Sequence, residues 1–395
     1  MPRLPDSSLP QPAAAAQAHS ARLQATIGQA IETAGGHIPF EQYMDLALYA
    51  PGLGYYSAGA QKFGSVGDFV TAPEISALFG RCLARQCSDI FAHLDNPVLL
   101  ELGAGSGQMA ADILAELEDL HALPEQYWIL EVSAELRVRQ YETLKKRVPQ
   151  LLDRVEWLNH LPQQPFNGVI LGNEVLDALP TAVFEIGPGG PREVNVAWQN
   201  EKLVGSLQAA RKELIRAVTA IEKEQGQKLA RGYRSEICLR LPAWIQSLAD
   251  SLNNGVMLFA DYGLPRREYY HAQRSRGTLM CHYRHRAHED VFFWPGLQDI
   301  TAWVDFTALG EAALAADLDV LGYTTQAHFL LGAGLNECLR DLPTLSTKQQ
   351  AALTRQARQL VLPEDMGEKF KFMALGRGVD VPLRGFSVRD LRDKL

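Results

Sequence analysis

The sequence predicts an α/β fold built on a mostly parallel, doubly wound sheet with helices on both faces. Short apolar runs alternate with helical stretches from residue 97 onward, and the clearest runs are 97–102, 127–132, 168–173 and 255–263. This alternation is typical of βαβ units, in which crossover helices connect parallel strands. The runs are apolar throughout instead of at every second position, as expected for strands that are buried on both faces.

The chain ahead of this sheet is expected to contain a tail, two helices and a long loop. Residues 1–21 are rich in Pro, Ala, Ser and Gln, which is typical of a disordered tail. Residues 22–34 and 38–49 carry apolar side chains at helical spacing. The stretch 50–74 is rich in glycine and aromatic residues, and a loop of that length is usually functional. We therefore assign residues 22–95 to an N-terminal helical extension with a cofactor-covering loop.

The core is expected to extend from residue 96 to residue 395, with two insertions that bind the substrate. Residues 181–207 read as antiparallel strands around a Gly- and Pro-rich turn, and residues 264–300 form a long excursion rich in Arg, His and Tyr. An amphipathic helix is expected between them, from about residue 207 to 221. The apolar run 369–378 is expected to be the last strand, and an antiparallel direction is compatible with the pattern.

Composition excludes several classes of protein. The chain has 395 residues, 47% of them hydrophobic, which is enough for a large core. The formal charge of −8 argues against a nucleic-acid partner, which would need clustered positive charge. No apolar run approaches the ~20 residues of a membrane helix, and the N-terminus lacks the pattern of a secretory signal. The five cysteines do not form a disulfide framework, so we expect a cytoplasmic protein with reduced thiols.

A glycine-rich loop follows the first predicted strand, in the stretch LLELGAGSGQ. Gly103, Gly105 and Gly107 permit a tight turn and a close approach of the backbone to a ligand. The dinucleotide motif G-x-G-x-x-G would need a third glycine at Gln108, so a nicotinamide cofactor is disfavoured. The carboxylate of Glu101 would repel a pyrophosphate, whereas it suits a cationic ligand without phosphate. S-adenosylmethionine, which carries a sulfonium and an ammonium, is such a ligand.

The second predicted strand ends at an acidic residue, Glu131. Its separation from Gly107 along the chain suits a carboxylate that accepts hydrogen bonds from both hydroxyl groups of a ribose, as in dinucleotide-binding folds. Taken alone, the glycine motif has a plain tight turn as its alternative, and Glu131 has a solvated acid as its alternative. The order of strand, glycine loop, helix, strand and acid favours a cofactor site.

Five motifs together resemble one family, the MidA-like methyltransferases, to which the mitochondrial complex I assembly protein arginine methyltransferase belongs. They are FVTAPEIS, LELGAGSGQ, LGNEVLDALP, DYG and DITAWVDF. The resemblance covers nearly the whole chain and implies a bacterial member. It implies a class I, Rossmann-like methyltransferase fold and S-adenosylmethionine as methyl donor. It also implies methylation of an arginine in a protein partner, which for the mitochondrial member of the family is a subunit of complex I. The resemblance further implies that Thr71 and Glu74 help to close the cofactor pocket, and that Asp299 and Thr301 border the substrate cleft. The alternative for Thr71 and Glu74 is a turn followed by an N-cap for the next helix.

An amide and two carboxylates follow the third strand, which is unusual for the end of an apolar strand. A guanidinium is planar and charged, and carboxylates can grip it in a fork and orient one nitrogen. We therefore expect Asn173 to contact the cofactor, and Glu174 and Asp177 to face the acceptor. The alternative is that Asp177 caps the turn ahead of Pro180 and that Glu174 is only solvated.

The stretch CHYRHRAHED places one cysteine and three histidines close together, at Cys281, His282, His285 and His288. We expect no metal, because the spacing does not suit one face of a helix and no second ligand cluster exists in the sequence. A substrate-facing loop is the favoured interpretation, with His285 as a candidate general base or a hydrogen-bonded structural histidine. Asp305 is expected to cap the next helix.

The leading prediction is an S-adenosylmethionine-dependent methyltransferase that acts on arginine in a protein. The alternatives are a methyltransferase for a small molecule and a non-catalytic assembly factor that binds S-adenosylmethionine. An enclosed apolar pocket would favour the small-molecule alternative. A cofactor site that binds without turnover would favour the assembly factor.

Overall fold

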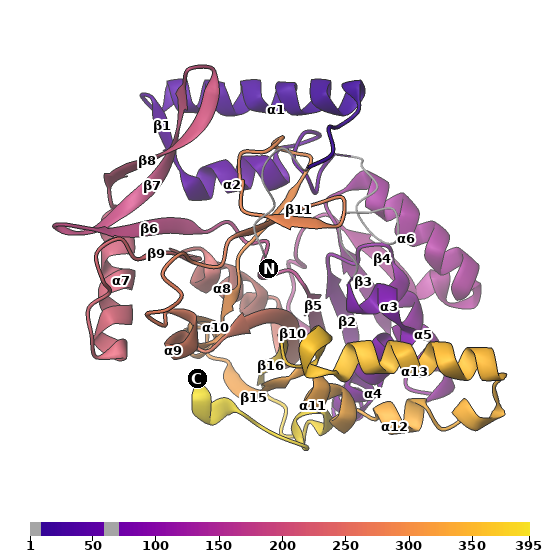
Figure 1. Ribbon diagram of the computed structural model, residues 1–395. Coiled ribbons are helices and arrows are strands. Elements are labelled where there is room, and N and C mark those ends of the chain that lie inside the picture. The colour runs from indigo at the N-terminus through magenta and orange to yellow at the C-terminus, as the bar shows by residue number, and fades with distance from the viewer. Residues whose placement is uncertain (1–8, 59–70) are drawn as a thin grey trace. The chain divides into compact units, whose positions relative to one another are not determined.

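The structure is a computed structural model that describes residues 9–58 and 71–395 (Figure 1). The chain forms two compact units. The insert unit comprises Met1–Phe69, Asp177–Leu241 and Leu264–Trp303, and the core unit comprises Val70–Leu176, Pro242–Gly263 and Val304–Leu395. The predicted insertions are therefore wider than 181–207 and 264–300, and they group with the N-terminal helices instead of with the sheet of the core.

The core unit is built on one mixed sheet with the strand order β15-β16-β10-β5-β2-β3-β4. The strands, including the short β14 beside β10, are β2 (Val98–Leu102), β3 (Gln126–Leu130), β4 (Val155–Leu158), β5 (Phe166–Asn173), β10 (Leu252–Leu264), β14 (Val304–Asp305), β15 (Asp319–Thr325) and β16 (Phe370–Arg377). Neighbours from β4 to β10 are parallel, whereas β16 is antiparallel to both β10 and β15. The predicted mostly parallel sheet is confirmed, and the last strand is antiparallel, a direction that the sequence pattern allowed.

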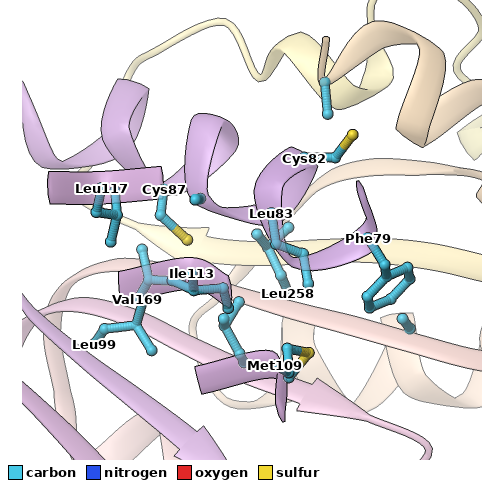
Figure 2. Close-up of a cluster of buried hydrophobic side chains, with 14 of the residues drawn as sticks. Phe79, Cys82, Leu83, Cys87, Leu99, Met109, Ile113, Leu117, Val169 and Leu258 are labelled. Atoms are coloured by element: carbon cyan, nitrogen blue, oxygen red, sulfur yellow. The ribbon is translucent and has the colours of Figure 1, made fainter. Parts of the chain in front are cut away.

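Helices cover both faces of this sheet. Successive residues of a strand point to opposite sides, so both faces offer side chains on which helices pack. On one face α4 (Ala77–Phe91), α5 (Gln108–Asp119) and α6 (Ala134–Arg147) pack on residues such as Leu99 and Val169, and Figure 2 shows this cluster. The same cluster includes residues of α11 (Gln326–Gly332), α12 (Leu335–Cys338) and α13 (Thr347–Val361). On the other face, Trp244 of α8 (Leu241–Asp250) lies 5.7 Å from the ring of Phe259 on β10.

The insert unit contains two small antiparallel sheets. The larger has the order β1-β7-β6-β9 with β8 beside β7, and the smaller has the order β12-β11-β13. The strands are β1 (His37–Pro39), β6 (Ala182–Gly187), β7 (Gly190–Gln199), β8 (Lys202–Ala209), β9 (Arg234–Ile237), β11 (Met280–Tyr283), β12 (Arg286–His288) and β13 (Asp299–Thr301). The predicted antiparallel strands at 181–207 are confirmed.

The insert unit has two hydrophobic cores, and successive side chains of β6 point into different ones. Val183 joins a cluster with α1 (Ala14–Thr33) and α2 (Phe40–Tyr49). Phe184 joins a second cluster, with α7 (Lys212–Gln225) and the tyrosines next to the short α9 (Arg266–Tyr269). The period of two in a strand thus lets one sheet bury apolar side chains on both faces.

The predicted disordered tail at 1–21 is wrong from Ala14 onward, because α1 begins there. Alanine has the highest helix propensity, so the alanine-rich segment that read as low complexity extends the helix. The helix buries Leu23, Ile27 and Ile31, and the hydroxyl of Ser20 donates to the carbonyl of Pro295 at 2.9 Å. Tertiary contacts of this kind stabilise a helix whose composition alone favours disorder.

Two short polar residues begin helices of the core unit. Asp305 precedes α10 (Phe306–Ala315), and its carboxylate accepts from the N–H of Ala308 at 3.1 Å, as predicted. Ser76 caps α4 in the same way, with its hydroxyl oxygen 3.3 Å from the N–H of Leu78. The short helix α3 (Ala72–Ile75) precedes it.

Candidate active site

The glycine-rich loop between β2 and α5 has a backbone that only glycine adopts readily. Gly103, Gly105 and Gly107 have φ angles of 64°, 53° and 80°, in the left-handed region that a β-carbon disfavours. Gly107 is also confined, because a β-carbon there would lie 2.9 Å from the Cα atom of Gln140 on α6. α5 begins at the next residue, so unpaired N–H groups and the positive end of the helix dipole adjoin the loop.

Glu131 follows β3 and is joined to the glycine loop through Gln140. The carboxylate of Glu131 accepts from the N–H of Ser133 at 2.8 Å and from Nε2 of Gln140 at 3.0 Å. The same Gln140 amide donates to the carbonyl of Gly105 at 3.1 Å, and its oxygen accepts from the indole of Trp157 at 2.9 Å. Sequence reasoning missed Gln140, because a glutamine inside a helix has no local signature.

Beside Glu131, an apolar side chain is unusually exposed. Val132 directly follows Glu131, lies two residues beyond the end of β3 and has 69% of its surface exposed. An isolated exposed apolar side chain is ordinary on a protein surface, so only its position next to Glu131 makes Val132 a candidate contact for a ligand. This residue was also missed from the sequence.

Thr71 and Glu74 lie at the start of α3, next to the glycine loop. The hydroxyl of Ser106, inside the loop, donates to the carboxylate of Glu74. Thr71 is buried and precedes α3 without a hydrogen bond from its side chain to the helix. Since Ser76 caps α4, the alternative that this motif only caps that helix is not supported.

Glu101 differs from the expectation of a carboxylate presented at the loop. The side chain is fully buried in β2, and the hydroxyl of Tyr127 donates to its Oε2 at 2.6 Å. Burial raises the pKa of Glu101 to about 7, opposed by the Tyr127 hydrogen bond and assisted by the negative charge of Glu131. The carboxyl is therefore largely protonated below neutral pH, and its contact with a cationic ligand stays a prediction.

The turn after β5 carries Asn173 and Glu174 in an uncommon backbone conformation. Glu174 has a φ angle of 52°, which is rare for a residue other than glycine. The N–H of Glu174 donates to the carbonyl of Ala260 on β10 at 2.9 Å. The side-chain amide of Asn173 donates to Oε1 of Glu174 at 3.3 Å. Both side chains are partly exposed, so they can meet a ligand at the carboxyl end of the sheet.

Asp177 lies in the insert unit, in a buried cluster of tyrosines and carboxylates. The rings of Tyr49 and Tyr56 stack with centroids 5.5 Å apart, and the hydroxyl of Tyr56 donates to both oxygens of Asp299 at 3.0 Å. Burial raises the pKa of Tyr56 well above its usual value, and the charges of Asp299 and Asp177 raise it further. Asp177 and Asp299 are only 5% and 3% exposed. Asp177 and Asp299 thus both lie close enough to Tyr56 to raise its pKa, although their role in binding an acceptor stays a prediction.

His285 lies at the exposed two-residue turn between β11 and β12. Arg284 and His285 have φ angles of 47° and 59°, as in a tight hairpin turn of the primed type. An exposed hairpin tip gives a general base no fixed position, so nothing in the described geometry supports this candidate. Within residues 9–58 and 71–395, no group of three or more His, Cys, Asp or Glu side chains could hold a metal ion.

A model of the S-adenosyl-L-methionine-dependent methyltransferase family matches residues 82–324. The mitochondrial protein arginine methyltransferase NDUFAF7 of Danio rerio is 30% identical over 370 residues, which are 87% of this chain and 84% of the relative. The chain belongs to this methyltransferase family. NDUFAF7 of Mus musculus is 32% identical over 371 residues, covering 86% of this chain and 81% of the relative. These matches confirm the MidA-like family that the sequence motifs indicated.

A solved structure supports the fold and the cofactor. The crystal structure of a Burkholderia thailandensis protein bound to S-adenosyl-homocysteine is 42% identical to this chain. The two structures agree with a TM-score of 0.92 over 98% of this chain and 100% of that chain. The methyltransferase therefore has the class I fold and uses S-adenosylmethionine, so the nicotinamide alternative is excluded. In the part of the chain that the structure describes, no helix is long and apolar enough to span a membrane.

Proposed function

We propose that this methyltransferase holds S-adenosylmethionine along the carboxyl ends of β2, β3 and β5. The left-handed glycines Gly103, Gly105 and Gly107 let the loop backbone approach a ligand closely, next to the unpaired N–H groups at the start of α5. Glu131 would accept from the ribose hydroxyls, and the exposed Val132 beside it would be covered by the adenosyl group. The remaining proposed contacts are Thr71, Glu74, Glu101 and Asn173.

We further propose that the methyl acceptor is an arginine of a protein partner, and that Glu174 contacts its guanidinium. The relatives named protein arginine methyltransferase support this substrate class. The observation that carries the proposal is the partly exposed carboxylate of Glu174, held in a left-handed turn at the end of the strand that precedes Asp177. A carboxylate can orient a guanidinium through paired hydrogen bonds and stabilise its charge. Asp177 and His285 remain weaker candidates for acceptor binding and proton transfer.

S-adenosylmethionine supplies an electrophilic methyl group on a sulfonium. During transfer, a guanidinium nitrogen would form the new N–C bond while the S–C bond breaks, the electron pair of that bond would stay on sulfur, and the nitrogen would release its proton to water. Glu174 would align the guanidinium and stabilise its positive charge. Orientation of this kind contributes mainly to the rate and little to the affinity for the methyl donor.

The test is transfer of labelled methyl groups from S-adenosylmethionine to proteins of a host lysate, with Glu174→Gln beside the wild type. We expect the variant to lose transfer while its affinity for S-adenosyl-homocysteine, measured by calorimetry, is retained. Glu201→Gln is the matched control, because Glu201 is an exposed glutamate with a φ angle of 61° in a turn of the insert unit. It makes the same chemical change in the same backbone conformation, and it should leave transfer unchanged.

The other outcomes separate the alternatives. Loss of both transfer and cofactor affinity in Glu174→Gln would assign Glu174 to the cofactor. Label in a small molecule but in no protein would identify a small-molecule methyltransferase. Binding of S-adenosyl-homocysteine without any transfer by the wild type would favour a binding-only assembly factor. Mass spectrometry of a labelled protein would locate the methyl group, and a lysine or glutamine site would refute arginine as the acceptor.

A further inference from the structure

The turn that carries Glu174 is enforced by its surroundings. β5 and β10 pair in parallel up to Asn173 and Ala260, and the two chains then separate. Glu174 turns away from the sheet with a φ angle of 52°. A residue with a β-carbon adopts this conformation only where neighbouring groups compensate for it, and such residues concentrate at functional sites.

Asp261, the next residue of β10, holds the far end of this turn. Its side chain is 0% exposed, Oδ2 accepts from the N–H of Leu176 at 2.9 Å, and Oδ1 accepts from the N–H of Tyr262 at 2.9 Å. A buried carboxylate is costly unless its oxygens are hydrogen-bonded. Together with the carbonyl of Ala260, which accepts from the N–H of Glu174 at 2.9 Å, Asp261 ties both ends of the turn to β10.

Between these two anchors, Val175 fills the space next to the glycine loop. A β-carbon at Gly172 would lie 2.8 Å from Cγ2 of Val175 and 2.8 Å from Cδ1 of Phe259. A β-carbon at Gly103 would lie 3.6 Å from Cγ1 of Val175. The turn therefore packs against the loop proposed to bind the cofactor, and a close-packed arrangement of this kind has one well-defined position.

We propose that Asp261 is a positioning residue for methyl transfer, whose carboxylate holds the turn 174–176 so that Glu174 is presented to the acceptor. This inference rests on the proposed role of Glu174. Misplacement of a reacting group by ~1 Å can cost about 100-fold in rate, so loss of one anchor lowers the rate although Glu174 is still present. The glycine loop has a separate anchor, because the N–H of Gly103 donates to the carbonyl of Leu130 at 3.0 Å.

Asp261→Asn tests the proposal with the least change of shape. The amide oxygen can accept from one of the two N–H groups, whereas its NH2 group would face the other donor. We expect kcat for the protein acceptor to fall by at least about tenfold. The KM for S-adenosylmethionine and the Kd for S-adenosyl-homocysteine should stay within about threefold of the wild type. Hydrogen exchange of the amides at 174–176 should become faster, because their turn opens more often.

Glu116→Gln is the matched control for a general loss of stability. Glu116 is a buried carboxylate of the core unit, on α5, and it accepts from Arg81 at 2.6 Å and from Arg85 at 2.8 Å. This variant should lower the midpoint of thermal unfolding, yet leave kcat and the exchange at 174–176 unchanged. A fall of kcat in proportion to the loss of stability in both variants would make Asp261 merely structural.

The exchange measurement distinguishes failure of this inference from failure of the proposed function. If the wild type methylates no protein, the function proposed for Glu174 fails, but faster exchange at 174–176 in Asp261→Asn would still support the anchoring role. If the wild type methylates a protein and Asp261→Asn keeps its kcat, the positioning role is overturned. Unchanged exchange at 174–176 would overturn it in either case.

Discussion

The buried carboxyl of Glu101 should make the stability of the core unit depend on pH, and Glu101→Gln should remove that dependence. The side chain lies within the central strand β2 with no exposed surface, and its Oε2 accepts a hydrogen bond from the hydroxyl of Tyr127 at 2.6 Å. Glutamine has nearly the same size and can accept the same hydrogen bond through its oxygen. The substitution therefore removes the ionisable carboxyl group while the packing is retained.

The magnitude follows from linkage between proton binding and folding. The pKa of Glu101 rises from 4.5 to about 7 because burial disfavours the ionised form. The folded state thus holds the proton more tightly, and this contribution to stability is fully present below about pH 4.5 and is lost as the pH rises through about 7. At 1.36 kcal/mol for each pKa unit, the loss approaches ~3 kcal/mol above pH 8. Glutamine pays no such cost, so the variant should be more stable than the wild type at high pH.

Urea unfolding of both proteins between pH 5 and 8.5 measures this difference. We expect the free energy of unfolding of Glu101→Gln, relative to the wild type, to increase through this range by ~2–3 kcal/mol. Tyr127→Phe should extend the pH dependence to higher pH, because it removes the hydrogen bond that lowers the pKa of Glu101. A difference between Glu101→Gln and wild type that does not change with pH would refute the reasoning. It would mean that the pKa of Glu101 in the folded protein stays near its usual value.

Three further substitutions test how the glycine loop of the core unit and the buried Glu236 of the insert unit contribute to stability. Gly107→Ala should lower the free energy of unfolding by about 2–4 kcal/mol, because it adds a backbone clash to the cost of a left-handed φ. Gly103 has a similar φ angle, but a β-carbon there would have no contact closer than 3.6 Å, so Gly103→Ala should cost only about 1 kcal/mol. Equal losses of unfolding free energy for the two variants in urea titrations would contradict the role of the clash. Glu236→Ala should destabilise the insert unit by about 2–4 kcal/mol, since its carboxylate accepts from the N–H of Thr278 at 2.6 Å and from the hydroxyl of Tyr269 at 2.9 Å. A midpoint of thermal unfolding within 1 °C of the wild type would show instead that water replaces the carboxylate.

Local patterns in the sequence were sufficient for the elements that lie next to one another along the chain. Continuous apolar runs predicted the parallel strands, and the run at 369–378 predicted β16. Glycines at 103, 105 and 107 predicted the loop after β2, and Asp305 predicted a helix start, because turns and caps depend on a few adjacent residues. The family was also readable from short motifs, since catalytic and cofactor-binding residues occur in fixed local spacing.

Other features depend on contacts between residues far apart in the chain, which no local period encodes. The pairing of β1 with β7 joins the N-terminal segment to the segment Asp177–Leu241, and an isolated bridge between Arg234 and Arg276 joins the segment Leu264–Trp303 to it. Packing of α6 on the glycine loop brings Gln140 to Glu131, and packing around β2 buries Glu101 and raises its pKa.

What the sequence alone determined is four parallel strands and the last strand of the core sheet, the glycine loop, the family and the carboxylates available for chemistry. What only the tertiary structure decided is the state of each carboxylate. Glu101 is buried, Glu174 is partly exposed in a left-handed turn, and Asp261 anchors that turn. The physical reason is that the sequence specifies which side chains can ionise or hydrogen-bond, whereas desolvation and the partners of each group arise from the packing of distant segments.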